Sequence, residues 1–372
     1  MKMRRNWLFA AVLVSAAVLQ AQTWQIGPFT RPANGNPVIA PRPESTFPDP
    51  VLKTAVRWEA LHTFNPAAIV REGKVFVLYR AEDDSGTLSG EMEIGSHTSR
   101  LGLAESEDGV HFTRRADPVF FPAKDSQKAR EWPGGVEDPR IVESEDGNYV
   151  LTYTQWNRKD ISVGIATSSD LVHWSKHGPA FLTAAGGKYS HLKYKSAGIV
   201  TRLDPDKGRL IAARIDGKYW MYWGEGSIRL ASSTDLIHWT PVEDAAGAPL
   251  ELLRPRPGHF DSSFPETGPP PILTSAGIVV IYNGKNAPGG GDPELGPEAY
   301  AAGEALFDGG DPAHLLAQTD HPLLKPELPY EKTGQYAAGT TFAEGLVYFH
   351  GRWFLYYGCA DSLVAVGSAP AR

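Results

Sequence analysis

The chain has 372 residues, 42% of them hydrophobic, and its 36 Lys and Arg against 43 Asp and Glu give a formal net charge of −7. This length can bury a large core, and the negative charge argues against nucleic acid as a partner, because a polyanion would be repelled. The 38 Gly and 30 Pro argue against long uninterrupted helices, and the single cysteine, Cys359, excludes an internal disulfide.

Residues 1–21 have the organisation of a secretory signal peptide: a basic start, an apolar run over residues 7–19 and a small residue, Ala21. The apolar run is too short to span a bilayer comfortably, and no cysteine follows it that could carry a lipid anchor. We therefore expect a protein exported to the periplasm or outside the cell, without a membrane anchor. Residues 22–372 are expected to form one catalytic domain.

A phrase of aromatic and β-branched residues that ends in tyrosine occurs five times along the chain. Successive copies are spaced by 74, 69, 60 and 74 residues, and their tyrosines are Tyr79, Tyr153, Tyr222, Tyr282 and Tyr356. This period, filled with short strands and turn residues, is typical of a four-stranded antiparallel blade. The sequence therefore predicts an all-β fold, a five-bladed β-propeller with four-stranded antiparallel blades. The closing "LVAVGSA" (363–369) is expected to complete a blade begun by the N-terminal segment.

A second phrase, with the pattern Ala-x-Ser-x-Asp followed by an aromatic residue, lies between the tyrosine phrases. Its three aspartates are Asp108, Asp170 and Asp235. A short acidic side chain commonly caps its own turn, and a catalytic residue has no reason to recur in every blade. We therefore interpret these aspartates as structural, and we look for polar residues that depart from the repeats.

The sequence "GGVEDPR", residues 134–140, is one such departure. Proline disfavours the helical conformation in the residue before it, so Asp138 is expected to be extended at the entrance of a strand. Arg140 follows two positions later on the same face, close enough to hold Asp138 or a bound hydroxyl group. Taken alone, Asp-Pro-Arg is more typical of a salt-bridged turn than of an active site.

Two glutamates also depart from the repeats. Glu225 ends the third tyrosine phrase, and Glu266 lies in a turn-rich segment directly before the fourth. Because the innermost strands of propeller blades run in one direction, Asp138, Glu225 and Glu266 are expected to converge at one end of the axis. Crowded carboxyl groups have separated pKa values, which glycoside hydrolysis requires of its acid and its base. Nearby tryptophans could stack on sugar rings, although most are expected in the core: Trp132, Trp156, Trp220 and Trp223.

Eight segments in this order resemble glycoside hydrolase family 130, five-bladed propellers that act on β-mannosides. The segments are "FNPAAI" (64–69), "VLYRAED" (77–83), "SRLGLAESEDGVHF" (99–112), "GGVEDPRI" (134–141), "TSSDLVHW" (167–174), "ETGPPPI" (266–272), "PYEKTGQ" (329–335) and "FLYYGCAD" (354–361). The resemblance covers nearly the whole mature chain, and the ordered set is far more specific than any single motif.

The family contains inverting phosphorylases and inverting hydrolases. The resemblance implies that Asp138 is the acid and that its proton reaches the glycosidic oxygen through a mannose hydroxyl. Phosphorylases of the family usually carry a His-Arg pair for phosphate where this chain has Trp223 and Gly224, followed by Glu225. The similarity to β-1,2-mannosidase members implies that Glu225 and Glu266 position and deprotonate water.

The resemblance further implies residues that bind hydroxyl groups of the sugar whose bond is cleaved: Asn65, Arg80, Arg100, Arg140 and Asp361. Each could equally form a structural hydrogen bond or ion pair. Lys195 and Ser196, in "YKSAGI", do not reproduce the family's Asn-Lys-Asp segment and receive no role.

The sequence therefore favours an exported inverting β-1,2-mannosidase whose partner is a β-mannoside oligosaccharide and which needs neither a metal nor another cofactor. Three alternatives stay open: a β-mannoside phosphorylase that uses inorganic phosphate, a glycan-binding propeller without turnover, and a propeller that cleaves arabinan or fructan.

Overall fold

The computed structural model describes residues 24–84 and 97–371, so the predicted signal peptide, residues 1–21, lies outside the described residues. The chain is nearly all β, with 46% strand and 3% helix, as its many turn residues predict. Within the two described ranges, no helix is long and apolar enough to cross a membrane.

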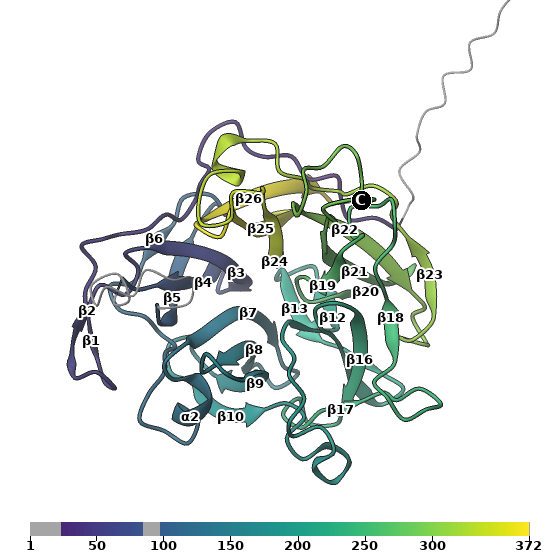
Figure 1. The fold of residues 1–372 in the computed structure, drawn as a ribbon, viewed down its shortest axis with the longest axis horizontal. Helices are drawn as coiled ribbons and strands as arrows, with labels where there is room; N and C mark the ends of the chain where they lie inside the picture. The colour runs from purple at the N-terminus through teal and green to yellow at the C-terminus, as the bar shows by residue number, and fades with distance from the viewer. Residues whose placement is uncertain (1–23, 85–96, 372) are drawn as a thin grey trace, which may run out of the picture.

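The strands follow one another along the chain in antiparallel groups (Figure 1). A two-stranded ribbon, β1 with β2, comes first, and two groups of successive antiparallel strands follow, β3 to β6 and β7 to β10. Their bounds are β1 (Phe47–Asp49), β2 (Thr54–Val56), β3 (His62–Arg71), β4 (Lys74–Glu82), β5 (Ser99–Ser106), β6 (Thr113–Arg114), α2 (Lys128–Glu131), β7 (Gly135–Glu143), β8 (Tyr149–Trp156), β9 (Ile161–Ser168) and β10 (Ser175–Pro179).

The second half of the chain continues this arrangement with a third group, β11 to β18, a fourth, β19 to β23, and a last group, β24 to β26; the strands at the start of the third and fourth groups are short, whereas β24 is unbroken. The bounds are η1 (Ala184–Gly187), β11 (Ala197–Ile199), β12 (Thr201–Asp204), β13 (Arg209–Ala212), β14 (Arg214–Ile215), β15 (Lys218–Trp223), β16 (Ile228–Ser233), β17 (Thr240–Pro241), β18 (Glu251–Leu253), β19 (Phe264–Thr267), β20 (Ile272–Thr274), β21 (Gly277–Lys285), β22 (Tyr300–Phe307), β23 (Leu315–Gln318), η2 (Pro329–Glu331), β24 (Thr341–Phe349), β25 (Arg352–Cys359) and β26 (Leu363–Pro370).

The groups are arranged around a common centre, next to which β3, β7 and β24 lie (Figure 1). β3 contacts both β7 and β24, and short parallel pairings join neighbouring groups: β5 to β7, β7 to β13, and β12 to β20. Residues at the corresponding ends of the inner strands therefore gather in one region, although they are far apart in the sequence.

The five repeated tyrosines lie in β4, β8, β15, β21 and β25, one in each group, and all are buried. In three groups a glycine lies directly across from the tyrosine on the next strand: Gly102 faces Tyr79, Gly164 faces Tyr153, and Gly303 faces Tyr282. A Cβ atom on Gly102 would lie 2.3 Å from the Tyr79 ring, so at that position the sheet requires glycine. The repeat found in the sequence therefore marks equivalent strands.

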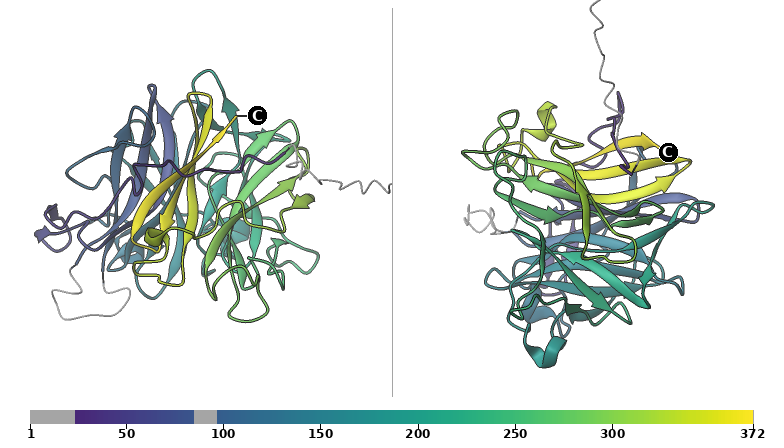
Figure 2. Two further views of the ribbon diagram at one scale, coloured as in Figure 1. Left: turned by 90° about the horizontal axis from the view of Figure 1, so that it is seen from above. Right: turned by 90° about the vertical axis from the view of Figure 1, so that its right-hand side faces the viewer.

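The N-terminal segment pairs with the last strand, as predicted. Thr30 and Ser368 exchange two backbone hydrogen bonds of 2.8 and 2.9 Å, and the Val364 amide donates to the Ile39 carbonyl at 3.0 Å. Figure 2 shows this segment crossing the strands near the C-terminus. The two ends of the chain thus belong to the same sheet.

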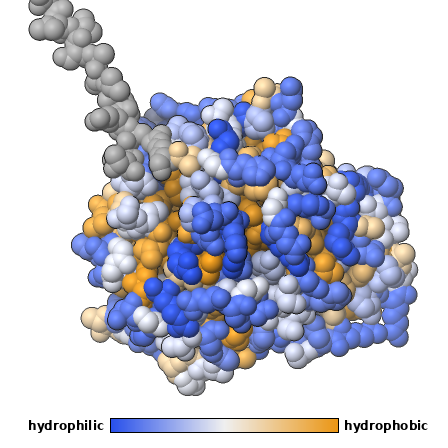
Figure 3. All heavy atoms as spheres, turned by 180° about the vertical axis from the view of Figure 1, so that it is seen from behind, coloured by the Kyte–Doolittle hydropathy of each residue, from blue (hydrophilic) through white to orange (hydrophobic). Residues whose placement is uncertain are grey.

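The three repeated aspartates cap turns, as predicted. In the first copy, Oδ1 of Asp108 accepts hydrogen bonds from the amides of Val110 at 2.9 Å and His111 at 2.8 Å, and Asp170 and Asp235 do the same in the other copies. On the face seen from behind, hydrophilic and hydrophobic residues are interspersed (Figure 3).

Candidate active site

Asn65 on β3 and Asp138 on β7 occupy equivalent irregular positions at the centre of the fold. Each precedes a proline and lies where the pairing with the next strand shifts register, and their φ angles are 45° and 46°. The expectation that Asp138 is extended is therefore wrong: the bulge in β7 places it in the left-handed region, which non-glycine residues rarely adopt. Nδ2 of Asn65 donates to Oδ1 of Asp138 at 2.9 Å, so the two irregularities direct these side chains toward one another.

The Asp138 carboxylate is buried among positive charges. Its Oδ1 also accepts a hydrogen bond of 3.1 Å from Nη1 of Arg80. Burial raises the pKa of Asp138, but the charges of Arg80, Lys195 and Arg140 and the Asn65 hydrogen bond outweigh it and lower this pKa to about 2. With these contacts Asp138 is ionised at neutral pH.

Arg80 links Asp138 to two further carboxylates, Glu82 and Glu137. Its Nη2 lies 2.7 Å from Oε1 of Glu82 and 2.9 Å from Oε1 of Glu137. Glu137 in turn accepts a hydrogen bond of 2.9 Å from Ser99. One guanidinium thus contacts three carboxylates, and the predicted site residues Asn65, Arg80 and Asp138 are brought together.

Glu225 and Glu266 meet at a single cation, the Lys195 ammonium. Nζ of Lys195 lies 3.3 Å from Oε1 of Glu225 and 3.3 Å from Oε1 of Glu266, and the backbones of the two glutamates form an isolated antiparallel bridge. Because the charge of Lys195 also lowers the pKa of Asp138, the three predicted catalytic carboxylates share one positive neighbour.

The two glutamates differ in burial. The Glu266 side chain is 1% exposed, whereas that of Glu225 is 40% exposed. Burial raises the pKa of Glu266 to about 7, although Lys195 and the 2.5 Å hydrogen bond from Ser196 oppose the shift. The pKa values of Glu266 and Asp138 are separated mainly because burial raises the first and neighbouring positive charges lower the second, so the raised value belongs to Glu266 and not to Asp138.

Arg140 cross-links the elements around the site instead of holding the Asp138 carboxylate. Its guanidinium donates to three backbone carbonyls, those of Asp138 at 3.0 Å, Thr267 at 2.7 Å and Gly268 at 3.2 Å. Nη1 also lies 2.9 Å from Oε1 of the buried Glu344 on β24. Arg140 is 1% exposed, so its contacts fix β7 against the segment that carries Glu266.

Asp361 lies at the edge of this cluster, directly after β25. Burial raises its pKa to about 6, against the opposing charge of Arg80 and with the support of Asp138 and Glu82. Asp361 is the only carboxyl in the predicted hydroxyl-binding set, and it shares partial exposure with Arg80. Its position therefore fits a hydrogen-bonding role toward a ligand.

Arg100 is not brought to the other predicted site residues. Its Nη2 lies 2.6 Å from Oδ2 of Asp49 and its Nη1 lies 2.8 Å from Oδ2 of Asp83, and all three side chains have an exposed fraction of 0%. A ligand has no access to this guanidinium in the structure. The contacts of Arg100 hold the β1 segment to the β4–β5 pair.

Four further side chains belong to this region: Lys195 and Ser196, to which the sequence analysis gave no role, and Glu137 and Glu344, which it did not single out. Ser196 has a φ of 56° and lies directly before β11, as Asn65 and Asp138 lie on their own inner strands. Its place at the start of the third group is the signal that could have given "YKSAGI" a role in the site. Glu137 and Glu344 lie at buried positions of β7 and β24, where a carboxyl is expected only if it has a partner.

The tryptophans do not form a common platform. Trp223 is 2% exposed and packs in a hydrophobic core with Phe181 and Tyr194, while Trp132, Trp156 and Trp220 are partly buried. In the described part of the chain, no cluster of three or more His, Cys, Asp or Glu side chains is arranged to hold a metal ion.

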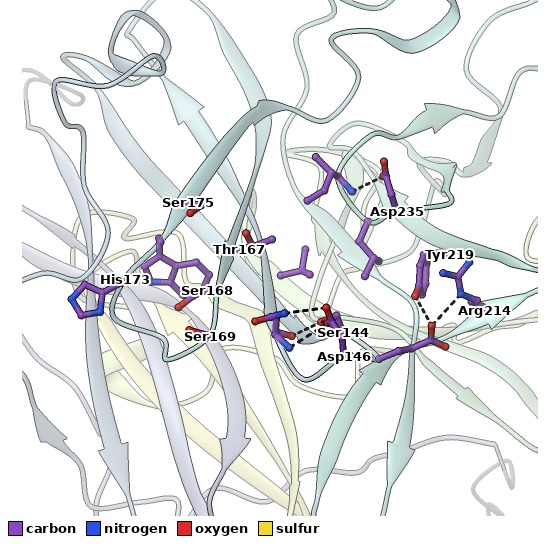
Figure 4. Close-up of a pocket in the computed structure, with 16 residues that line it drawn as sticks. Ser144, Asp146, Thr167, Ser168, Ser169, His173, Ser175, Arg214, Tyr219 and Asp235 are labelled. Atoms are coloured by element: carbon purple, nitrogen blue, oxygen red, sulfur yellow. Dashed lines mark hydrogen bonds and ion pairs between the residues drawn. The ribbon is translucent and has the colours of Figure 1, made fainter.

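A cavity of about 710 Å³ lies away from this site, between the β7–β8 turn and the turn that follows β16 (Figure 4). Within it, Glu145 accepts hydrogen bonds from Tyr219 at 2.7 Å and Arg214 at 3.2 Å. None of the predicted site residues lines this cavity.

The comparisons with known proteins place this geometry in a family. The model of glycoside hydrolase family 130, described as β-1,4-mannooligosaccharide phosphorylase, matches residues 31–372. A 1,2-β-oligomannan phosphorylase of Thermoanaerobacter sp. (strain X514) is 31% identical over 324 residues, which cover 85% of this chain and 93% of that protein.

Two solved structures are more similar in sequence. A glycosyl hydrolase from Bacteroides ovatus is 49% identical with a TM-score of 0.90, and the match covers 95% of this chain and 97% of that one. A second structure is 48% identical with a TM-score of 0.90, covering 95% and 98%. It is described with the words "The GH130 family of mannoside phosphorylases contains glycoside hydrolases that target beta-1,2 mannosidic linkages in Candida mannan".

Proposed function

The chain belongs to glycoside hydrolase family 130, whose members act on β-mannosides, and we propose that it is an exported hydrolase that cleaves β-1,2-linked mannosides with inversion. The observation that carries this proposal is the ion-paired trio of Glu225, Lys195 and Glu266 beside Asp138. Asp138 is the acid in this proposal, and the two glutamates activate water. No cofactor takes part. We further propose that the antiparallel groups are the five blades of a propeller.

The charge of the glutamate pair favours water over phosphate. Two like charges about 4 Å apart repel by about 4 kcal/mol at an effective dielectric constant of about 20, and phosphate would bring up to two charges against each carboxylate. Lys195 is already engaged by both glutamates. Water carries no charge and can donate a hydrogen bond to a carboxylate. The buried Trp223, where phosphorylases usually have a basic residue, supports the same choice.

Asp138 must carry a proton when the glycosidic bond breaks, although its pKa in the described structure is about 2. A bound sugar would exclude water from the open side of the site around the buried Asp138, and a drier site disfavours the carboxylate. A mannose hydroxyl between Asp138 and the glycosidic oxygen would then donate its own proton and receive that of Asp138. Asn65 and Arg80 hold the carboxylate in place for this step.

The proposal is tested by incubating the protein with β-1,2-mannobiose, with and without inorganic phosphate, and following the products by proton NMR. We expect free mannose at the same rate in both samples, with the α-anomer appearing first because the reaction inverts the β-linkage. Mannose 1-phosphate formed only when phosphate is present would assign the chain to the phosphorylases instead.

The same experiment separates the enzyme from a glycan-binding protein without turnover. Binding of mannobiose by calorimetry without product over many hours would favour the binding protein. A panel that adds β-1,4-mannobiose, arabinan and fructan tests the linkage, and we expect the β-1,2-linked substrate to be cleaved fastest.

A further inference from the structure

Lys195 is the only group in direct contact with both glutamates among the described ion pairs, and the proposed reaction has so far given it no task. Its Nζ lies at the same distance, 3.3 Å, from one oxygen of Glu225 and one oxygen of Glu266. Glu266 and Glu225 together outweigh the effect of burial and raise the pKa of Lys195 well above its ordinary value, so Lys195 stays protonated. A permanent cation is therefore built between the two carboxylates.

Only one of these glutamates is open to water. A cavity of about 490 Å³ is lined by Lys195 and Glu225, together with Trp223, Arg229 and Glu251, and Glu266 does not line it. Oε1 of Glu266 is held by Ser196 at 2.5 Å, and its Oε2 is buried without a hydrogen-bond partner among the described residues. Glu266 is thus an anchor inside the protein, whereas Glu225 presents its carboxylate outward.

The backbone around Glu225 does not by itself fix the direction of its side chain. Glu225 lies between Gly224 and Gly226, whose φ angles are 119° and 84°, and glycine permits many backbone conformations. The backbone of this segment is held at Gly224, whose amide donates to the Ser196 carbonyl at 2.8 Å and whose carbonyl accepts from the Thr267 amide at 3.1 Å, and by the bridge to Glu266. The Glu225 carboxylate itself is restrained by the ion pair with Lys195. Removal of Lys195 would leave the Glu225 carboxylate without its described ion-pair partner.

We propose that Lys195 is a positioning residue of the reaction, which anchors on buried Glu266 and aims Glu225 as the carboxylate that takes the proton of the attacking water. This inference rests on the proposed function. In the step, an O–H bond of water breaks and its proton goes to Glu225, while the water oxygen bonds to the anomeric carbon. The glycosidic C–O bond breaks, and the leaving oxygen receives the proton that originates from Asp138. Lys195 gains and loses no proton.

The positive charge of Lys195 also predicts a pH signature. Because the glutamates are close together and share one cation, they titrate as a pair, and the pair must be fully ionised before it can accept a proton from water. Removal of the Lys195 charge raises the pKa at which the Glu225–Glu266 pair loses its last proton. Several other groups act on Glu266 and its partners from the surrounding elements: Arg140 and Asp138 on β7, Tyr300 on β22, and Glu344 on β24.

The test compares Lys195→Met and Lys195→Arg with the wild type, using pH profiles of kcat/KM on β-1,2-mannobiose. For Lys195→Met we expect kcat to fall about 100-fold, within the range for a disturbed general base, and the acidic limb to move up by about one pH unit. Lys195→Arg keeps the charge, so its acidic limb should stay at the wild-type pH. Lys74→Met is the matched control, because Lys74 is 37% exposed, pairs with Glu105 and does not line this cavity; its pH profile should be unchanged.

A double-mutant cycle tests whether Lys195 acts through Glu225. In a Glu225→Gln background, Lys195→Met should cost less than tenfold further activity, because the carboxylate that it positions has already been removed. Additive losses, or an acidic limb that does not move in Lys195→Met while its melting temperature matches the wild type, would overturn the inference. If the wild type cleaves mannobiose without phosphate, those results would contradict the role of Lys195 but leave the hydrolase proposal intact. Turnover of the wild type that depends on phosphate would contradict the hydrolase proposal.

Discussion

Two ion clusters in this protein share one arrangement, a cation between two carboxylates, yet they differ in how completely they are enclosed. In the Arg100 cluster, Asp49 and Asp83 lie 2.6 and 2.8 Å from the guanidinium and all three side chains are fully buried. In the Lys195 cluster both distances are 3.3 Å, and the exposed fractions of Lys195 and Glu225 are 23% and 40%.

The difference shows that residue type and strand position do not decide whether an ion cluster is structural or functional. The planar guanidinium of Arg100 contacts each partner with a separate nitrogen, and the surrounding protein leaves no space for a ligand. The ammonium group of Lys195 is compact and, unlike a guanidinium, does not present its N–H donors in a fixed planar geometry. One side of the Lys195 cluster also faces a cavity. We therefore expect the two clusters to respond to mutation in opposite ways.

The largest effect on activity is expected for Glu225→Gln. The substitution removes the carboxylate that is accessible to water but keeps its shape, so kcat should fall about 1,000-fold, as for loss of a general base. Because the side chain is 40% exposed, the melting temperature should change little. Steady-state kinetics and thermal unfolding check both, and full turnover would remove Glu225 from the mechanism.

Arg100→Met should have the opposite result, a large loss of stability with little loss of activity per folded molecule. Removal of one member of a buried ion cluster leaves uncompensated charges and typically costs about 3–5 kcal/mol. Urea denaturation measures the free energy of unfolding. Arg254→Met is the control, because Arg254 is 69% exposed in its pair with Glu251 and should cost about 0.5 kcal/mol or less. Equal costs for the two variants would show that burial of the Arg100 cluster does not matter.

The smallest expected effect is a change in the pH dependence of stability in Glu266→Gln. The folded-state pKa of Glu266 is raised to about 7, above the unfolded value of about 4.3, so the folded state favours the protonated form. Its contribution to stability is present below the unfolded pKa and is lost as pH rises toward 7. Glu266→Gln should therefore lose less stability than the wild type between pH 5 and pH 8, measured as the free energy of unfolding. A difference of the opposite sign would show that Lys195 outweighs burial at Glu266.

Much of the fold follows from the sequence, because its repeats are fixed by packing. The tyrosines recur since each lies buried in the equivalent strand of its group, and the Asp108 turn recurs in three groups that use the same connection. The pairing of the N-terminal segment with residues 363–369 was predictable for the same reason: the last group otherwise lacks a strand. Such repeated features indicate local structure that is shared by the groups in which they occur.

The site was predictable only in part, because it consists of the departures from the repeat. Asp138, Glu225 and Glu266 were identified as departures, and they gather around one cation. Lys195 receives no role from the sequence because a lysine before a strand gives no local signal, and its importance depends on Glu225, which follows β15, and on Glu266 from the next group. Arg100 was assigned to the sugar because the sequence does not show that Asp49, 51 positions earlier, folds back to enclose it.

The pairing of Thr30 with Ser368 has a consequence for the order in which this protein folds during synthesis. The first strand segment leaves the ribosome more than 300 residues before its partner, so the sheet that contains both ends stays incomplete until translation is finished. Every earlier group has its sequence neighbours at hand when it emerges. Closure of this sheet joins residues 30–39 to residues 364–368, and deletion of either segment removes these backbone hydrogen bonds.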